Sequence, residues 1–168
     1  MSQQEPLTDY EEGLVDNVRE HGWFCVAVFG ETEGSEFAYS VGFWETLRVP
    51  ELIILGLPLK LMHSMLWSAF RQIEAKKTLV ADGVRWPDLI EGFDCISRPV
   101  HPTQMSREKF NSALWYRRYR TGQDEDLEAF QLFWPGAKDG LFPWEAGCSD
   151  LVRAYQPQLY FPLETGIA

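Results

Sequence analysis

Two apolar, β-prone runs on either side of a turn constrain the fold of this chain more than any other feature. The first run reads WFCVAVF at 23–29, and after GETEGS at 30–35 the chain continues as EFAYSVGF. Such runs around a glycine-containing turn predict a β-hairpin. Its second arm alternates large and small side chains, with Phe37, Tyr39, Val41 and Phe43 on one face and Ala38, Ser40 and Gly42 on the other. The small face permits close packing of another element.

Three segments carry helical signals. Thr8 and Glu11 have the spacing of a capping box, which predicts a first helix that ends near Gly22. A longer helix is predicted after Pro58, because apolar residues then recur with the helical period at Met62, Met65, Leu66, Ala69, Phe70 and Ile73. Ser106 is placed to cap a third helix that runs to about Arg120.

Further strands are predicted from short apolar runs at 51–55, at 93–100 and within AFQLFWP at 129–135. The pair Asp82-Gly83 predicts a short hairpin over 79–85. After residue 135 the chain is rich in Gly, Pro and aromatic residues, which favours ordered loops packed by rings. Together these segments predict an α+β fold, with a mostly antiparallel sheet, about three helices packed on it, and aromatic-rich loops.

The size of the chain suits one domain. It has 168 residues, of which 45% are apolar, so we expect a single domain over 8–162 with flexible ends at 1–7 and 163–168. No signal-peptide pattern and no run of ~18 apolar residues is present, so we expect a cytoplasmic protein that does not enter membranes. The three cysteines are far apart and odd in number, which favours reduced core residues.

The charge balance narrows the class of partner. Fifteen Lys and Arg against 25 Asp and Glu give a net charge of −10. Such a chain repels nucleic acid and anionic lipid surfaces, and it attracts basic proteins. The acidic residues that we expect to be exposed lie in two turns, Glu31, Glu33 and Glu36 in the first and Asp124, Glu125 and Asp126 in the second.

No motif for metal binding, for cofactor binding or for catalysis is present. The histidines His21, His63 and His101 stand in different predicted elements, and the chain has no HxxxH or CxxC pair. It also lacks the GxSxG, GxGxxG and GxxxxGK[ST] patterns of hydrolases and nucleotide-binding proteins. We therefore predict no catalytic residue, no metal and no cofactor, and we favour a binding protein over an enzyme.

Four segments, taken in order, resemble a known family. They read HGWFCVAVF at 21–29, FAYSVGFWETLRVPELIILGLP at 37–58, ALWYRRY at 113–119 and QLFWPGAKDGLFPWEAG at 131–147, the last with the later QP at 156 and 157. Together they resemble the bacterial domain of unknown function 4262. That family has no assigned activity, so the resemblance implies one intact domain and transfers no functional residue.

Two functional hypotheses follow from these features. The first is a non-catalytic protein-binding module, for example an immunity or antitoxin-like protein that neutralises a basic toxin. Its contact residues would be the six acidic residues of the two turns together with Trp144 and Glu145, because tryptophans are enriched at interface hot spots. A scaffolding role in a larger assembly and the oligomeric state are left open.

The second hypothesis is an enzyme or sensor for a small molecule such as a flavin, a nucleotide or an acyl compound. Its pocket would lie near Ser40 and Trp134, between the small face of the hairpin and the aromatic loops. Glu51 begins a buried strand, where its charge needs a partner, and Arg117, Arg118 or Arg120 could supply one. The candidate pocket residues are Tyr39, Ser40, Glu51, Arg117 and Trp134.

Overall fold

The computed structural model describes residues 5–163, and it contains one six-stranded sheet. The strands are β1 (Phe24–Val28), β2 (Phe37–Val41), β3 (Glu51–Leu55), β4 (Val84–Ile90), β5 (Phe93–Pro99) and β6 (Ala129–Phe133). They lie in the order β1-β2-β3-β6-β5-β4, and all neighbours are antiparallel except β3 and β6. Strands β1 and β4 therefore form the two edges of the sheet.

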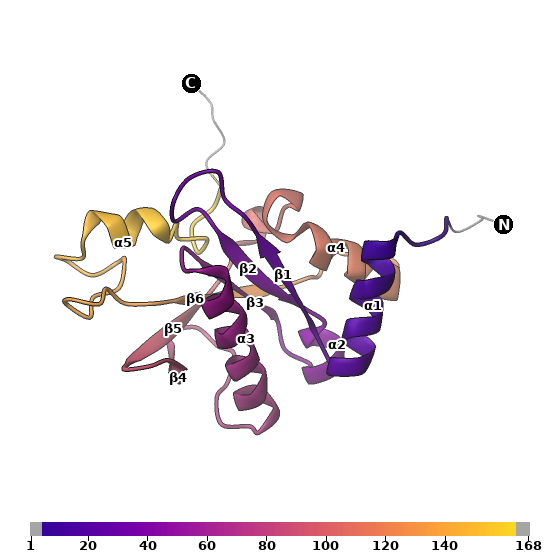
Figure 1. Cartoon of the computed structure of the whole chain (residues 1–168), viewed down its shortest axis with the longest axis horizontal. Coiled ribbons are helices and arrows are strands. Elements are labelled where there is room, and N and C mark those ends of the chain that lie inside the picture. The colour runs from indigo at the N-terminus through magenta and orange to yellow at the C-terminus, as the bar shows by residue number, and fades with distance from the viewer. Residues whose placement is uncertain (1–4, 164–168) are drawn as a thin grey trace.

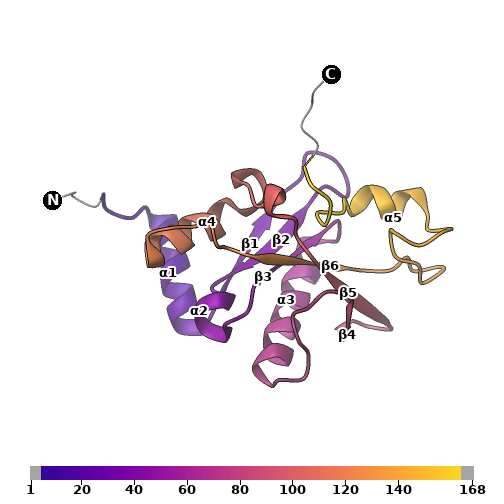
Figure 2. The ribbon, with the colours of Figure 1, turned by 180° about the vertical axis from the view of Figure 1, so that it is seen from behind.

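Helices cover both faces of this sheet. They are α1 (Asp9–His21), α2 (Phe43–Leu47), α3 (Leu59–Glu74), α4 (Arg107–Thr121) and α5 (Asp150–Tyr155), and Pro102–Gln104 forms a 3-10 turn. Helix α3 crosses one face (Figure 1), and α4 lies on the opposite face (Figure 2). Residues that alternate along β2 enter two separate cores, with Ala38 on the α3 side and Tyr39 and Val41 on the side of α1 and α4. The α+β class with a mostly antiparallel sheet is thus confirmed.

The strongest local signals of the sequence are confirmed. Thr8 and Glu11 form both hydrogen bonds of the capping box, and α1 ends at Gly22, whose φ of 90° suits glycine. The hairpin of β1 and β2 is antiparallel, and the strand predicted at 51–55 has the bounds of β3. All six apolar residues predicted to face the core from α3 are buried.

The hairpin predicted about Asp82-Gly83 is wrong. Strand β4 begins only at Val84 and returns through the tight turn between Ile90 and Phe93 to pair with β5. The segment before Gly83 is held by β5 instead, since the Gly83 N–H donates to the Ser97 carbonyl and the Ser97 hydroxyl donates to the carbonyl of Ala81. The sequence analysis also missed α2 and α5, which are too short to show a helical period.

The C-terminal segment is ordered by rings and by two buried glutamines. Trp144 stacks on Phe142 with ring centroids 5.2 Å apart, which confirms the aromatic packing of the loops. The side-chain amide of Gln156 accepts from the Trp134 N–H and donates to the Trp134 carbonyl. It thus forms the two backbone hydrogen bonds that a neighbouring strand would form at the end of β6. Gln131 donates to the Pro157 carbonyl in the same region. The segment after α5 is therefore anchored to the sheet.

The flexible ends predicted at 1–7 and 163–168 fall mostly on 1–4 and 164–168, which lie outside the described residues. Among residues 5–163, no helix is both long enough and apolar enough to cross a membrane.

Candidate functional site

A cavity of about 300 Å³ lies between α2 and α4, at the end of the sheet where β3 begins. Helix α2 and the turn before it supply one wall, and one face of α4 supplies the other. Leu127, which precedes β6, and Glu51, the first residue of β3, complete the lining. The cavity thus combines segments that lie far apart in the sequence.

The carboxylate of Glu51 is buried beside this cavity, with 3% of the residue exposed. Its Oε1 accepts hydrogen bonds from the Ser40 hydroxyl (2.8 Å) and from the Phe43 N–H (3.1 Å). Its Oε2 accepts from the Gly42 N–H at 3.1 Å. The Ser40 oxygen in turn accepts from the Leu52 N–H at 2.9 Å. Glu51 therefore ties the turn between β2 and α2 to the start of β3.

Burial raises the pKa of Glu51 to about 7, from its ordinary value of 4.5. Desolvation is the largest cause, because it penalises the charged form, while the hydrogen bonds from Ser40 and from backbone N–H groups favour that form and oppose the rise. Near neutral pH the group is therefore present both as a carboxylate and as a neutral acid. It accepts hydrogen bonds in the first form and also donates one in the second.

The expected ion pair between Glu51 and an arginine of α4 is wrong. The three guanidinium groups pair with other carboxylates: Arg117 with Asp126 (2.7 Å), Arg118 with Asp124 (2.8 Å) and Arg120 with Glu45 (2.9 Å). Within residues 5–163 no Lys or Arg nitrogen lies within 4.0 Å of the Glu51 carboxylate. Neutral donors satisfy Glu51, so it needs no buried cation.

Arginines and aromatic rings form the rim of the cavity. The Arg117 guanidinium lies over the Trp44 ring, 5.1 Å from its centre. The Tyr116 hydroxyl donates to Glu45 at 2.5 Å. Burial is the largest cause that raises the pKa of Tyr116 well above its ordinary value, and this hydrogen bond is the second. Arg48 has a left-handed φ of 59°, an uncommon conformation for a residue with a side chain.

Among the described residues, one guanidinium group of the rim has no carboxylate partner. Arg48 has no carboxylate within 4.0 Å among the described residues, whereas Arg117 and Arg120 are both in ion pairs. Backbone strain at residues with positive φ is often found at functional sites. The conformation of Arg48 is that of the C-cap of α2, whose N–H donates to the Trp44 carbonyl, and it directs an arginine without a carboxylate partner in residues 5–163 to the rim.

The structure brings together only part of the pocket predicted from the sequence. Ser40 and Glu51 are in contact, and Glu51 and Arg117 line the same cavity. Tyr39 points into the opposite core, where its hydroxyl accepts from the Ser112 N–H at 3.0 Å. The Trp134 indole donates to the Leu55 carbonyl at 2.8 Å, and Trp134 is absent from the cavity lining. Ala38, on the small face of β2, packs in one core with the buried residues of α3.

Sequence reasoning missed most of the residues that shape the cavity. The missed side chains are Trp44, Glu45, Arg48 and Tyr116, while Arg120 was expected only as a partner of Glu51 and not in the pocket. Those of α4 had a detectable signal, because Ala113, Tyr116, Arg117 and Arg120 follow the spacing of one helical face. Those of α2 had none, since that helix was not predicted.

The two acidic turns lie at opposite ends of β3. The carbonyl of Glu36, at the end of the first turn, accepts from the Gly56 N–H, and that of Glu128, after the second turn, accepts from the Glu51 N–H. The residues Glu31, Glu33, Glu36, Asp124, Glu125 and Asp126 therefore do not gather into one patch. The Arg117 side chain also lowers the pKa of Asp126 through hydrogen bonding and charge.

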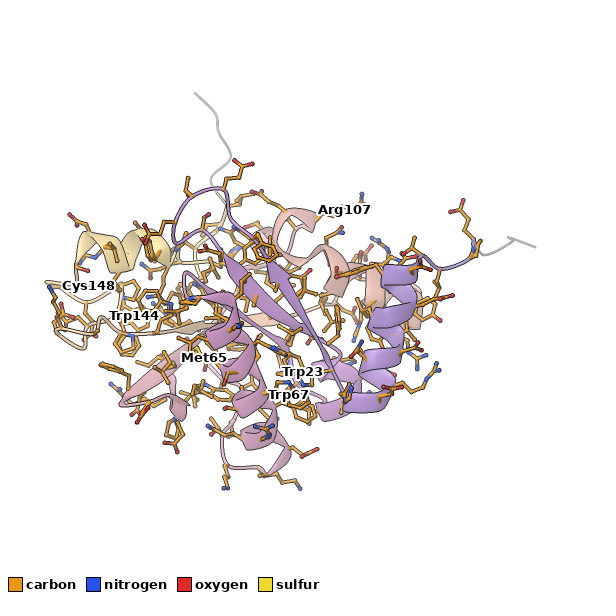
Figure 3. All side chains as sticks on the ribbon, viewed as in Figure 1. Trp23, Met65, Trp67, Arg107, Trp144 and Cys148 are labelled. Carbon is orange, nitrogen blue, oxygen red and sulfur yellow. The ribbon has the colours of Figure 1, made fainter. Side chains whose placement is uncertain are left out.

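The other two predicted contact residues belong to the loop before α5 (Figure 3). Trp144 is 36% exposed and packs edge-on against Phe133, with ring centroids 5.0 Å apart. The Arg98 guanidinium lies 4.9 Å from the centre of the Trp144 ring. Glu145 accepts from the Phe142 N–H at 2.9 Å. This loop is thus fixed by its own contacts.

The cysteines and the metal-ligating side chains form no second site. In the described part of the chain no group of three or more His, Cys, Asp or Glu side chains is placed to hold a metal ion. Cys25, Cys95 and Cys148 are free thiols. Burial raises the pKa of Cys25 and that of Cys95 to about 12, so both thiols are almost entirely protonated at neutral pH.

Comparisons with known proteins identify a family without an assigned function. No curated protein and no solved structure matches the chain. A family model described as "Domain of unknown function (DUF4262)" matches residues 17–149. The matched region includes all four segments that carried the resemblance and every residue that lines the cavity between α2 and α4. The chain therefore belongs to the DUF4262 family of domains of unknown function.

Proposed function

We propose that this protein is a non-catalytic binding protein or sensor for a small organic anion, and that the anion binds in the cavity between α2 and α4. The observation that carries the proposal is a buried carboxyl group, Glu51, beside a cavity of about 300 Å³ whose rim bears three arginines. The Ser40 hydroxyl donates to Glu51, but Ser40 is fully buried and does not line the cavity, so it offers no nucleophile to a ligand there.

The charges at the rim support an anionic ligand. Arg48, Arg117 and Arg120 line the cavity with Glu45 and Glu51, in a chain whose net charge is −10. Within residues 5–163 the Arg48 side chain has no carboxylate partner, and guanidinium groups bind carboxylates and phosphates through paired hydrogen bonds. An anion held by Arg48 is also attracted electrostatically by the guanidinium groups of Arg117 and Arg120.

The size and walls of the cavity narrow the ligand class. A volume of about 300 Å³ is at the low end for small-molecule pockets, which favours a compound smaller than a flavin or a dinucleotide. The Trp44 and Tyr116 rings offer apolar surface to an acyl chain or a ring. Of the three ligand classes expected from the sequence, acyl compounds with a carboxylate or phosphate group fit best.

Glu51 makes the binding sensitive to pH. A second negative charge near a carboxyl group favours its neutral form, so a bound anion raises the pKa of Glu51 further above about 7. Binding is then coupled to proton uptake, and the ligand binds more tightly at pH 6 than at pH 8. The variant Glu51→Gln removes the titrating group and abolishes this dependence.

A thermal-shift panel of small carboxylates and phosphates, followed by calorimetry on the best compound, tests the proposal. We expect at least one compound to raise the melting temperature of the wild type and to lose most of its affinity in Arg48→Gln. The matched control is Arg107→Gln, at the far end of α4 (Figure 3), which keeps the affinity. If no compound stabilises the wild type, or if both variants bind equally well, the proposal fails.

The protein-binding hypothesis stays a prediction, as does the cytoplasmic location. The acidic turns at opposite ends of β3 give no single face for a basic toxin, and two of their carboxylates are paired with Arg117 and Arg118. For this reason we favour the cavity over the acidic surface.

A further inference from the structure

Strand β1 forms an unprotected edge of the sheet. Its sequence FCVAV has no charge and no proline, although lysines, prolines and bulges are the usual protection of an edge strand. The opposite edge, β4, has such protection, since it contains Pro87, the charged Asp88 at a φ of 62° and a bulge between Trp86 and Ile90. The two edges of one sheet therefore differ in their readiness to pair.

The register of the sheet shows which groups of β1 face outward. The Gly56 N–H donates to the Glu36 carbonyl, so the even-numbered residues of β2 bond to β3 and the odd-numbered residues bond to β1. The odd-numbered β2 residues lie opposite the even-numbered residues of β1. Cys25 and Ala27 consequently direct their N–H and C=O groups away from the sheet.

A groove of about 500 Å³ runs along this edge between α1 and α3. Its lining includes Asn17 of α1, Cys25 of β1, and His63 and Trp67 of α3. Trp23 lies against Trp67 in the groove (Figure 3), and its buried indole N–H has no acceptor among the described residues. The rings of Trp23 and Trp67 give the groove an apolar, aromatic wall.

Phe29 protrudes beside the groove. It is 83% exposed, the highest value among the large apolar residues of the described chain. Every second side chain of a strand points to the same face, and Phe29 is an even number of residues from Trp23, Cys25 and Ala27. Its side chain therefore lies on the α3 side of the sheet. The edge thus offers both an apolar projection and an apolar groove on the same face.

We propose that a second copy of this chain pairs with β1 in antiparallel orientation, about a two-fold axis at Val26. In this register the sequence numbers of two paired residues add up to 52. Cys25 therefore exchanges two hydrogen bonds with Ala27 of the partner subunit, and Ala27 exchanges two with Cys25 of the partner subunit. In this register Phe29 of the partner subunit lies opposite Trp23 and enters the groove. The occupant is a second copy because the projection and the groove belong to one self-complementary edge.

The charges that flank β1 agree with the same register. It places the acidic turn of one subunit, with Glu31 and Glu33, beside the end of α1 in the other, where Arg19 and His21 flank Glu20. His21 contacts Glu20 of its own helix at 3.8 Å, and Arg19 is the cation that this register brings near the two acidic residues at each end of the paired strands. This complementarity favours the symmetric register over one shifted by two residues.

Analytical ultracentrifugation over a concentration series tests the dimer. We expect the wild type to approach the dimer mass, and Phe29→Asp and Ala27→Pro to remain monomeric. Proline at an outward-facing edge position removes no hydrogen bond from the single chain. Leu79→Asp, an exposed position near the opposite edge, is the matched control and keeps the dimer. A wild type that stays monomeric at every concentration, or a dimer that survives Phe29→Asp, overturns the proposal.

Disulfide trapping tests the register independently. In Ala27→Cys, the new thiol lies opposite Cys25 of the partner subunit, at the ~5.5 Å Cα separation of a hydrogen-bonded pair, which a disulfide can span. Oxidation with diamide should give a dimer on a non-reducing gel that disappears on reduction. The double variant Cys25→Ser with Ala27→Cys should give none. Cross-linking that persists in the double variant would contradict the register.

Discussion

Replacing Glu51 by glutamine should change how the stability of the protein depends on pH. The carboxyl group has a pKa of about 7 in the folded protein, against an ordinary value of 4.5. Below pH 4.5 it is neutral in both the folded and the unfolded state. As the pH rises from 4.5 to about 7, the unfolded chain loses the proton first, so the stability of the folded state falls. Above about pH 7 both states are charged and the loss is complete.

The size of this loss follows from the same two values. A tenfold change in proton affinity corresponds to 1.36 kcal/mol, so the difference between 4.5 and about 7 corresponds to roughly 3 kcal/mol. The variant lacks this loss. It places an N–H against the Gly42 N–H in place of a carboxylate oxygen, which costs about 1 kcal/mol at every pH. We therefore expect Glu51→Gln to be less stable than the wild type at pH 4.5 and more stable at pH 8.

Urea unfolding followed by tryptophan fluorescence, at several values between pH 4.5 and pH 8.5, measures this crossing. The matched control is Glu125→Gln, which removes one negative charge from an exposed loop and so separates burial from net charge. The reasoning is refuted if the free-energy difference between Glu51→Gln and the wild type stays constant over this range.

Three further predictions concern the packing of the fold away from the cavity. Gln156→Ala leaves the N–H and C=O of Trp134 without partners, and we expect a loss of about 3 kcal/mol in urea unfolding; a loss below 1 kcal/mol would contradict the anchoring role. Gly56→Ala places a methyl group 2.4 Å from the Tyr155 carbonyl oxygen at a φ of 88°, so the melting temperature should fall; an unchanged value would refute the close packing. Cys95, with a pKa of about 12, should react with iodoacetamide at pH 8 about a thousandfold more slowly than a thiol of pKa 9.0, as mass spectrometry would show, and rapid labelling would contradict its burial.

The sequence predicted the elements whose signals are local. Helix α3 was predicted because six apolar residues share one face, and the hairpin of β1 and β2 because both arms are apolar around a turn. The turn of the β4 hairpin was misplaced because Asp82-Gly83 has strong turn chemistry, yet pairing with β5 begins only at Val84. Tertiary pairing overrode the local preference there.

The site was only partly predictable, because its geometry depends on contacts between distant segments. Glu51 was recognised as a buried charge at the start of a strand, and that burial is confirmed. Its donors were not predicted, since the N–H groups of Gly42 and Phe43 converge on it only through the short helix α2. The rim also depends on the contact between Arg120 and Glu45, which are 75 positions apart in the sequence. No spacing rule within one element reveals such a pair.

The most direct test of the cavity is an amide NMR titration with the compound that gives the largest thermal shift. We expect saturable shifts at residues 42–51 and 113–127, which surround the cavity, at pH 6, with weaker binding at pH 8. Glu51→Gln should show the same pattern of shifts with no change in affinity between the two pH values. Shifts that lie elsewhere on the protein, or an affinity in the wild type that does not depend on pH, would contradict the proposal that Glu51 and the arginine rim form a binding site.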